Sequence, residues 1–386
     1  MTTTSVVLPD FADPVAVRRH LHRFPELSLQ ERQTAALIAE RLRTLGLRVR
    51  EGVGGTGVLG VLEGGRPGPT TLLRADMDGL PVRELNDVAY SSANEGVMHA
   101  CGHDAHMSVL LGAAAELTAR RAEAPGTIVF CFQPGEEGAA GNRLMIHDGA
   151  LENPHVDRCF ALHVYSGLDV GKIGVRNGPF FASADEFQLT IEGKGGHGAM
   201  PQLSVDPVVV AAQFITALQT IVSREVHPKD PAVITVGHIE AGSTFNVIPD
   251  RAVLQATVRN FDRETRERMP ERIERVAKGV CEAMRARYQL EYRFSYPATV
   301  NDPAMTDVVR EIGAQVVGKA NVVEHDVVLW SEDMSFMQEE RPGSYFLLGV
   351  RGGPETAVPH HNARFNLDER ALQTGIQMMV ALGLRG

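Results

Sequence analysis

The stretch EFQLTIEG, residues 186–193, opens the segment that decides the fold. Its apolar and polar residues alternate, which predicts a β-strand with one buried face. The stretch DPVVVAAQFITALQTIVSRE, residues 206–225, follows it and carries apolar residues at helical spacing. A strand followed directly by a helix is therefore expected here.

The rest of this segment continues the pattern. Further strands are expected at 232–241, 251–261 and 288–296, with a helix rich in Glu and Arg at 263–286. The order strand, helix, strand, strand, helix, strand is the ferredoxin-like plan. About 110 residues are enough for a small domain of this kind.

On the N-terminal side of this segment, apolar strands alternate with amphipathic helices. The expected strands are 57–62, 70–76, 127–133 and 159–165, and the expected helices lie within 14–46 and at 104–121 and 141–149. This alternation predicts an α/β layer with a mostly parallel sheet. Residues 300–386 return to helices and short strands, so we expect them to rejoin the first domain. The predicted domains are 1–184 and 297–386, which form one α/β unit, and the insert 185–296.

The composition is that of an ordinary soluble globular chain. The 386 residues carry a net charge of −10, which argues against nucleic acid or an anionic membrane as a partner. The start, MTTTSVVLPDF, lacks the features of a signal peptide, and apolar runs such as SVLLGAAAEL are shorter than the roughly 18–20 residues of a membrane span. A cytoplasmic protein is expected. The four cysteines show no paired spacing, so no disulfide framework is expected.

Polar residues gather where the predicted strands end. The residues concerned are Asp76 and Asp78, Glu136 and Glu137, and His163, while Cys101 and His103 open a helix. In open α/β sheets, sites form beyond the carboxyl ends of the strands. Carboxylate, thiolate and imidazole together are a set of donors for divalent metal.

Cys101 and His103 alone allow three interpretations. They could be a ligand pair, since a spacing of two lets both reach one ion from a loop. They could also be a buried cysteine beside a helix-capping histidine. A Cys–His nucleophile dyad is weaker, because it leaves the glutamates and His163 without a task. His99 and His106 are expected to have structural or supporting roles.

The adjacent pair Glu136 and Glu137 is also ambiguous alone. PGEEG can be a solvated turn, but two buried glutamates repel each other unless a cation compensates. With a metal, one would ligate and the other would take a proton from the metal-activated water. His163 within FALHVY and the pair His360–His361 are equally ambiguous, and only their joint occurrence favours a metal site.

Nine sequence blocks, in order along nearly the whole chain, carry a resemblance to a known family. They are RRHLHRFPELSLQE (18–31), LLRADMDGLPV (72–82), MHACGHDAHMSVLLGAA (98–114), FQPGEEG (132–138), ALHV (161–164), GKGGHGAMP (193–201), FNVIPD (245–250), SEDMSF (331–336) and HHNARFNLDE (360–369). The sequence resembles the di-metal amidohydrolases that include hippurate hydrolases, bacterial N-acyl-amino-acid amidohydrolases and plant auxin-conjugate hydrolases. These belong to the wider aminoacylase and carboxypeptidase superfamily. The resemblance implies a mostly parallel α/β metallohydrolase domain with an inserted ferredoxin-like lid or dimerisation domain.

Carried over by position, the resemblance implies two divalent metal ions, zinc or manganese, with cobalt or nickel possible. The implied ligands are Cys101, His103, Glu137, His163 and His361, and the implied general base is Glu136. His361 is preferred to His360 because the family ligand stands four residues before an aromatic, here Phe365. Cys101 is the expected bridging ligand.

One position departs from the wider superfamily, which has a metal-binding histidine where this chain has Asp76. The departure fits the subgroup, in which Cys101 and His103 take over that task. Asp76 and Asp78 then become supports that orient the ligands, with simple turn capping as the equal alternative.

The insert contributes three further expectations. In relatives the histidine at the position of His197 reaches the partner subunit's active site and helps to hold the oxyanion; a glycine-rich hairpin with an incidental histidine is the alternative. Asn246 and Arg259 match positions that bind the substrate carboxylate, although Arg259 could equally form a surface ion pair. Relatives often continue the glycine loop with Pro-His where this chain has Pro201-Gln202, so substrate preference transfers less safely.

The expected activity is hydrolysis of the amide bond of an N-acyl amino acid, hippurate-like or N-acetylated, by a metal-activated water. A dipeptidase or carboxypeptidase on the same site is the alternative. A metal-dependent binding protein without turnover is a third possibility, against which the presence of Glu136 argues. The expected partners are a small-molecule substrate and a second copy of the chain, in a homodimer or a dimer-based tetramer.

Overall fold

A computed structural model describes residues 9–386. The first eight residues, which belong to the stretch MTTTSVVLPDF, lie outside the described residues. The chain forms two compact units. The large unit comprises the chain up to Gly178 with Val300–Asp326 and Asp333–Gly386, and the small unit comprises Pro179–Thr299 and Val327–Glu332. The finer domain bounds 184/185 and 296/297 stay a prediction.

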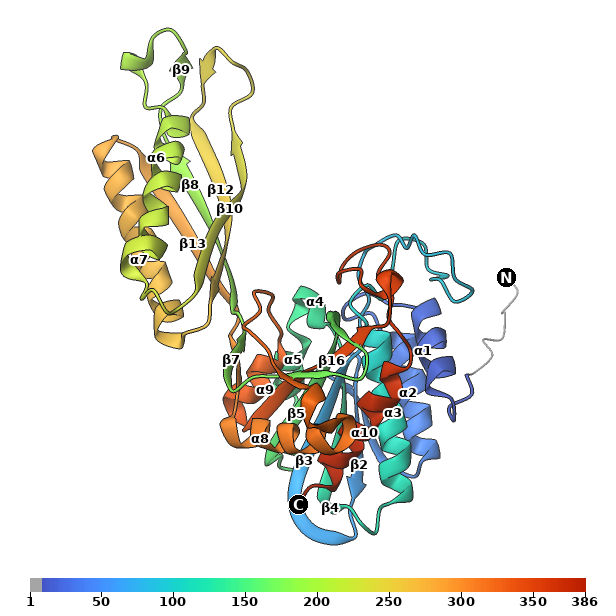
Figure 1. Cartoon of the computed structure of the whole chain (residues 1–386). Helices are drawn as coiled ribbons and strands as arrows, with labels where there is room; N and C mark the ends of the chain where they lie inside the picture. Colours follow the sequence, from blue (N-terminus) through green and yellow to red (C-terminus); the bar gives the residue numbers. More distant parts are fainter. Residues whose placement is uncertain (1–8) are drawn as a thin grey trace. The chain divides into compact units, whose positions relative to one another are not determined.

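The large unit is built on an eight-stranded sheet in the order β1-β2-β4-β3-β5-β16-β6-β15 (Figure 1). The strands are β1 (Arg48–Val53), β2 (Gly57–Glu63), β3 (Arg66–Asp76), β4 (Pro125–Gln133), β5 (Arg158–Asp169), β6 (Ile173–Val175), β15 (Val322–Glu324) and β16 (Gly343–Arg351). β4, β3, β5 and β16 pair in parallel, as do β6 and β15. The remaining pairs are antiparallel. The predicted α/β class with a mostly parallel centre is confirmed.

Helices cover both faces of this sheet. The helices are α1 (Pro14–Arg23), α2 (Arg32–Thr44), α3 (His103–Ala119), α4 (Glu136–Ala139), α5 (Gly141–His147), α8 (Pro303–Gly313), α9 (Met334–Glu340) and α10 (Ala371–Leu384). α1, α2, α3, α8 and α10 share one core with the sheet, whereas α5 and α9 contact each other and the opposite face (Figure 1). Consecutive residues of a strand point to opposite faces of the sheet. Because both faces are covered, the consecutive residues Val129 and Phe130 of β4 are both fully buried.

Parallel pairing brings the carboxyl ends of β3, β4 and β5 to one edge. Asp76, the last residue of β3, lies opposite Gln133, the last residue of β4. β5 continues on the other side of β3 and carries His163 beyond the paired stretch. The turns that follow these strands therefore meet at this edge.

The small unit has the ferredoxin-like plan. Its main elements are β8 (Ala184–Glu192), α6 (Pro207–Thr220), β10 (Ala232–Ala241), β12 (Arg251–Asn260), α7 (Arg263–Ala283) and β13 (Arg287–Tyr296). The antiparallel order is β10-β12-β8-β13, and the inward residues of the sheet pack with Phe214 of α6 and Ile273 of α7. The predicted topology of the insert is thus confirmed.

Short elements complete the chain. They are β7 (Gly178–Phe181), β9 (Gly196–His197), β11 (Val247–Ile248), β14 (Thr299–Asn301), the 3₁₀ turns Pro201–Leu203, Lys319–Asn321 and Pro354–Thr356, and the π-helical turns Ile221–Glu225 and Ala314–Gly318. Within residues 9–386, one helical stretch, Pro207–Glu225, is long and apolar enough to cross a membrane by length and composition. It contains α6, whose buried residues belong to the core of the small unit. The four cysteines, all in the described part, are free.

Candidate metal centre

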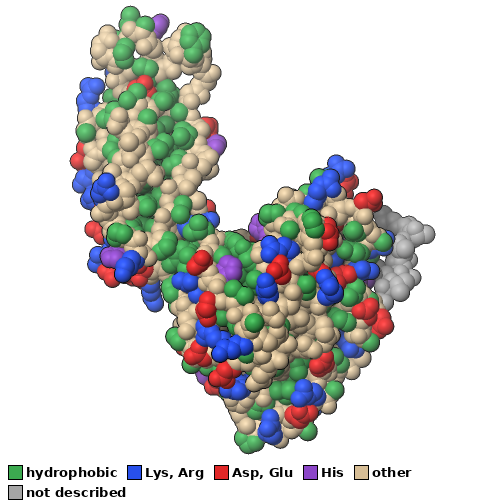
Figure 2. Space-filling view, in the orientation of Figure 1, with side chains coloured by type: hydrophobic (Ala, Val, Ile, Leu, Met, Phe, Trp, Pro, Cys, Tyr) green, Lys and Arg blue, Asp and Glu red, His purple; other side chains and the backbone are tan. Residues whose placement is uncertain are grey.

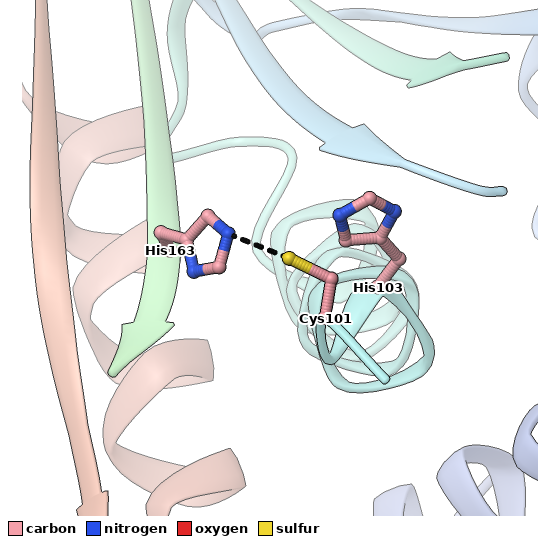
Figure 3. A group of neighbouring side chains, drawn as sticks. All are labelled: Cys101, His103 and His163. Carbon is pink, nitrogen blue, oxygen red and sulfur yellow. Dashed lines mark hydrogen bonds between the residues drawn. The ribbon is translucent and has the colours of Figure 1, made fainter. Parts of the chain in front are cut away.

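The centre begins at the loop that enters α3. The sulfur of Cys101 lies 3.4 Å from Nε2 of His163, and His103 stands at the first turn of α3 (Figure 3). One donor atom from each of the three lies within 4.8 Å of the others. Gly102 between them has φ 89°, and a Cβ there would meet Cγ2 of Val164 at 2.4 Å. Only glycine therefore allows this turn, which sends Cys101 and His103 toward one place.

Two further segments complete the cluster. Oε1 of Glu137, on the turn after β4, lies 3.1 Å from Nε2 of His361. Donor atoms of Cys101, Glu137 and His361 form a second group within 4.8 Å, and those of His103, Glu136 and Glu137 form a third. The His361 side chain is 56% exposed, whereas Cys101 is buried, so the cluster is open on the His361 side.

These groups overlap in Cys101, His103 and Glu137. The structure therefore brings together all five residues predicted as ligands, with the predicted base Glu136 beside them. Their roles stay a prediction.

Backbone carbonyls orient the imidazoles. Nδ1 of His163 lies 2.6 Å from the carbonyl oxygen of Val164, which leaves Nε2 facing Cys101. Nδ1 of His103 lies 2.9 Å from the carbonyl oxygen of Asp78, and its buried Nε2 makes no hydrogen bond. Oδ2 of Asp76 lies 3.6 Å from this nitrogen, beyond hydrogen-bond distance. A buried ring nitrogen without a hydrogen bond is unfavourable unless something else binds it, and a cation would do so.

Asp78 links two of the predicted ligands. Its Oδ1 lies 3.2 Å from Nδ1 of His103, and its Oδ2 accepts hydrogen bonds from the hydroxyl of Ser28 at 2.6 Å and the backbone N–H of Glu137 at 2.9 Å. One buried carboxylate thus fixes a ring and a backbone turn on different segments. This is the geometry of a supporting residue.

Asp76 has other partners. Its Oδ1 accepts from Nδ1 of His106 at 2.6 Å and its Oδ2 accepts from Nη1 of Arg74 at 2.8 Å. Nε2 of His106 in turn accepts from the backbone N–H of Val164 at 2.9 Å. Asp76, His103 and His106 could also surround an ion, but the hydrogen bonds already occupy Asp76 and His106. We therefore place them in the layer behind the centre.

The protonation of the centre reflects its buried negative charge. Burial raises the pKa of the Cys101 thiol, and the Glu137 carboxylate raises it further, well above its usual range. Burial alone would lower the pKa of His103, but Asp76 raises it to about 10. Burial lowers the pKa of His163 well below its ordinary value. Without a cation, the centre holds a thiol and an imidazolium beside carboxylates, and a bound cation would replace these protons.

The donor set fits divalent metal. Thiolate, imidazole and carboxylate are the ligands of zinc, and imidazole with carboxylate also suits other first-row metals. The fit rests on Nε2 of His103, which makes no hydrogen bond, and on the acidic surroundings of Cys101.

The residues predicted in the small unit fall into two places. His197 lies opposite Val247 in the β9–β11 pair, and the N–H of Gly198 donates to the carbonyl oxygen of Asn246 at 2.8 Å, so His197 and Asn246 are neighbours and both are exposed. Arg259 lies at the other end of β12, half-buried, where it donates to the carbonyl oxygen of Val258 at 3.2 Å.

A strand rises about 3.3 Å per residue, so roughly 25 Å of β12 separate Arg259 from the Asn246 end. Asn246 and Arg259 of one chain therefore cannot bind the same carboxylate.

Sequence reasoning missed a buried network behind the centre. Arg74 donates to Asp76 at 2.8 Å, to Asp333 at 2.9 Å and to Gln133 at 2.8 Å. Asp333 also accepts from the backbone N–H of Asn142 at 3.0 Å. The only signal was that Arg74, Gln133 and Asp333 lie within blocks shared with the resembled family, LLRADMDGLPV, FQPGEEG and SEDMSF.

Comparison with known proteins agrees with the geometry. The sequence model of peptidase family M20/M25/M40 matches residues 72–385. The N-acetyl-L-cysteine deacetylase of Bacillus subtilis is 40% identical, over 93% of this chain and 84% of its own length, and thermostable carboxypeptidase 2 of Saccharolobus solfataricus is 39% identical, over 96% and 94%. The crystal structure of the Bacillus subtilis YXEP protein, described as a dinuclear metal-binding peptidase, superimposes with a TM-score of 0.85 at 34% identity and covers 97% of both chains.

The fold, the donor set and these likenesses define a metal-dependent hydrolase. The chain belongs to peptidase family M20/M25/M40.

The raised pKa values predict that metal binding releases protons. At pH 7 the Cys101 thiol and the His103 imidazolium are both protonated, so loading should release about two protons per chain, and affinity should fall as the pH is lowered. Calorimetry in buffers of different ionisation enthalpy measures the number. C101S should release about one proton fewer, since a serine hydroxyl stays protonated. Equal release by parent and C101S would contradict thiolate ligation.

Proposed function

We propose that this protein hydrolyses the amide bond of N-acyl amino acids, with Glu136 as the general base. The observation that carries the proposal is the adjacency of Glu136 and Glu137 to His103, within 4.8 Å, beside a buried thiol and imidazole. A binding protein would have no use for a second carboxylate at this place.

The two glutamates differ in their surroundings. Glu137 faces His361 at 3.1 Å and is held by its backbone to Asp78, as expected of a ligand. Glu136 is 7% exposed on the same turn and lies near His103. These surroundings support the proposed role of Glu136, which is to take a proton from the attacking water and to deliver it to the leaving amine.

Two divalent cations bound by Cys101, His103, Glu137, His163 and His361 would supply Lewis acidity and lower the pKa of water, toward about 7 for zinc. The open side at His361 would admit the substrate, while the buried side excludes bulk water from Glu136. The thiolate supports zinc as the first candidate metal, with manganese as the second.

His197 and Asn246 would complete the site from a second copy of the chain. Both are exposed, and apolar side chains near them are exposed too, Phe245 completely and Leu203 to 61%. Figure 2 shows hydrophobic side chains on the surface at the end of the small unit where Figure 1 labels β9. Such an exposed apolar patch is typical of an interface. Dimerisation through the small unit would cover it. Arg259 is separated from Asn246 along β12. In such a dimer, Asn246 of one chain and Arg259 of the other chain would bind the same substrate carboxylate.

The substrate class is tested by an activity panel. Protein reconstituted with zinc or manganese should cleave N-acetyl, N-benzoyl or indole-acetyl amino acids faster than dipeptides, and metal-free protein should cleave neither. The Bacillus deacetylase supports this order, whereas the Saccharolobus carboxypeptidase favours the alternative. Faster cleavage of dipeptides would establish the alternative, and activity that survives chelation but not thiol alkylation would establish the cysteine-nucleophile dyad.

E136Q should separate catalysis from metal binding. The amide keeps the volume of the side chain but cannot accept the proton, so kcat should fall about 10²- to 10⁴-fold while metal content stays at the parent value. Metal analysis and initial rates on the same samples provide the two measurements. Unchanged hydrolysis would remove Glu136 from its role.

Mixed dimers should reveal whether His197 acts in its partner's site. E136Q and H197A should each be nearly inactive, but their co-expression should yield mixed dimers in which one site has both residues. Random pairing makes half of the dimers mixed, with one of two sites restored, so about a quarter of the parent rate is expected. A co-expressed mixture no more active than the separate variants would contradict sharing.

A further inference from the structure

Glu31 is a fully buried carboxylate whose hydrogen bonds reach three separate segments. Its Oε1 accepts from the backbone N–H of Leu29 at 2.9 Å and from that of Gly135 at 2.8 Å. Its Oε2 accepts from the hydroxyl of Thr56. Gly135 immediately precedes Glu136, so one of these bonds holds the start of the turn that carries both glutamates of the centre.

That turn lacks the regular hydrogen bonds that would stabilise its own conformation. α4 spans only four residues, Glu137 inside it is not helical, and Gly135, Gly138 and Ala140 all have positive φ, at 57°, 84° and 53°. Regular helical hydrogen bonds are therefore lost, and the backbone N–H groups need acceptors from elsewhere.

Buried carboxylates supply those acceptors. Gly135 donates to Glu31, Glu137 donates to Asp78 at 2.9 Å, and Asn142 donates to Asp333 at 3.0 Å. Asp78 also contacts His103. Glu31 is the acceptor at the beginning of the turn.

The backbone of Leu29 is held in an unfavourable conformation next to the turn. It has φ 61°, a conformation that is unfavourable for a residue with a Cβ. Its Cδ2 would lie 3.0 Å from a Cβ added to Gly135, so the Leu29 side chain packs against the turn. Glu31 binds the backbone N–H of both residues, and strain of this kind persists only where the surroundings enforce it.

A simple capping role does not account for Glu31. It is the N-cap residue of α2, yet its side chain makes no capping hydrogen bond to that helix. A buried carboxylate is unfavourable unless it is compensated, and here the compensation comes from other segments. The side chain thus joins the α2 entry to the glutamate turn.

We propose that Glu31 is a positioning residue that sets the turn bearing Glu136 and Glu137, and so the placement of the base and the ligand. Its effect on turnover rests on the proposed function, but its effect on the turn does not. Glu31 touches neither the predicted ligands nor the substrate side, and it acts through Gly135.

The first test is amide hydrogen exchange of peptides covering 134–141 in metal-free protein. E31A should exchange roughly tenfold faster there than the parent, because the amide of Gly135 loses its acceptor. E31Q keeps an acceptor oxygen and should stay close to the parent. I38A, a cavity in the core face of α2, should lower the melting temperature without changing exchange of this peptide.

The second test is kinetic, on metal-reconstituted protein. E31A should lower kcat roughly tenfold or more with KM little changed, E31Q should restore most of it, and I38A should match the parent well below its melting temperature. Parent-like exchange in E31A, or E31Q as defective as E31A, would overturn the proposal.

A second variant and a separate readout cover the cases in which E31A does not fold or the parent is inactive. If E31A does not fold, E31D shortens the side chain so that its carboxylate is withdrawn from the amide of Gly135. It should give faster exchange of the same peptide, and no change would overturn the proposal. If the parent cleaves no amide, the proposed function fails, whereas the exchange result still decides the role of Glu31.

Discussion

The main constraint on the structure is that two carboxylates and a cysteine sulfur lie close together in one buried place. Cys101, Glu136 and Glu137 lie in overlapping groups with donor atoms within 4.8 Å, and without a cation the protonated His103 offsets part of the negative charge. Like charges at this distance repel strongly where water is excluded. A bound cation would remove that repulsion and would also occupy Nε2 of His103, which makes no hydrogen bond.

The layer behind the centre is arranged differently, because its charges are already paired. Arg74 lies fully buried between Asp76 and Asp333 and donates to both. Asp78 is satisfied by Ser28 and by the backbone of Glu137. The rear layer therefore contains the permanently charged Arg74, whereas the positive charge of His103 in the front layer is a proton that a cation can displace, and this difference favours a cation at the front. The rear carboxylates serve to fix the backbone and the rings.

Much of this architecture could be predicted from local sequence. Strands buried on both faces are continuous apolar runs, as in TIVFCF, and the insert shows alternating strands, so the sheet and the ferredoxin-like plan were both predictable. Cys101 and His103, two residues apart in the sequence, also lie close together in the fold because Gly102 permits the turn between them.

The support of the site was not predictable in the same way. The hydrogen bond from Arg74 to Asp333 joins positions 259 residues apart, and that from Gly135 to Glu31 joins positions 104 apart. No periodicity encodes such pairs, because they depend on which strand ends meet. The separation of Asn246 and Arg259 along β12 likewise became visible only once the strand was placed.

The central claim is that Cys101, His103, Glu137, His163 and His361 hold a pair of cations. Anomalous diffraction from crystals of the protein loaded with zinc or manganese, collected at the absorption edge of the metal, tests it most directly. The account predicts two peaks per chain, both bounded by these five side chains and about 2.0–2.3 Å from their donor atoms for zinc. Peaks confined to Asp76 and His106, or no peak at the five residues in fully loaded protein, would contradict it.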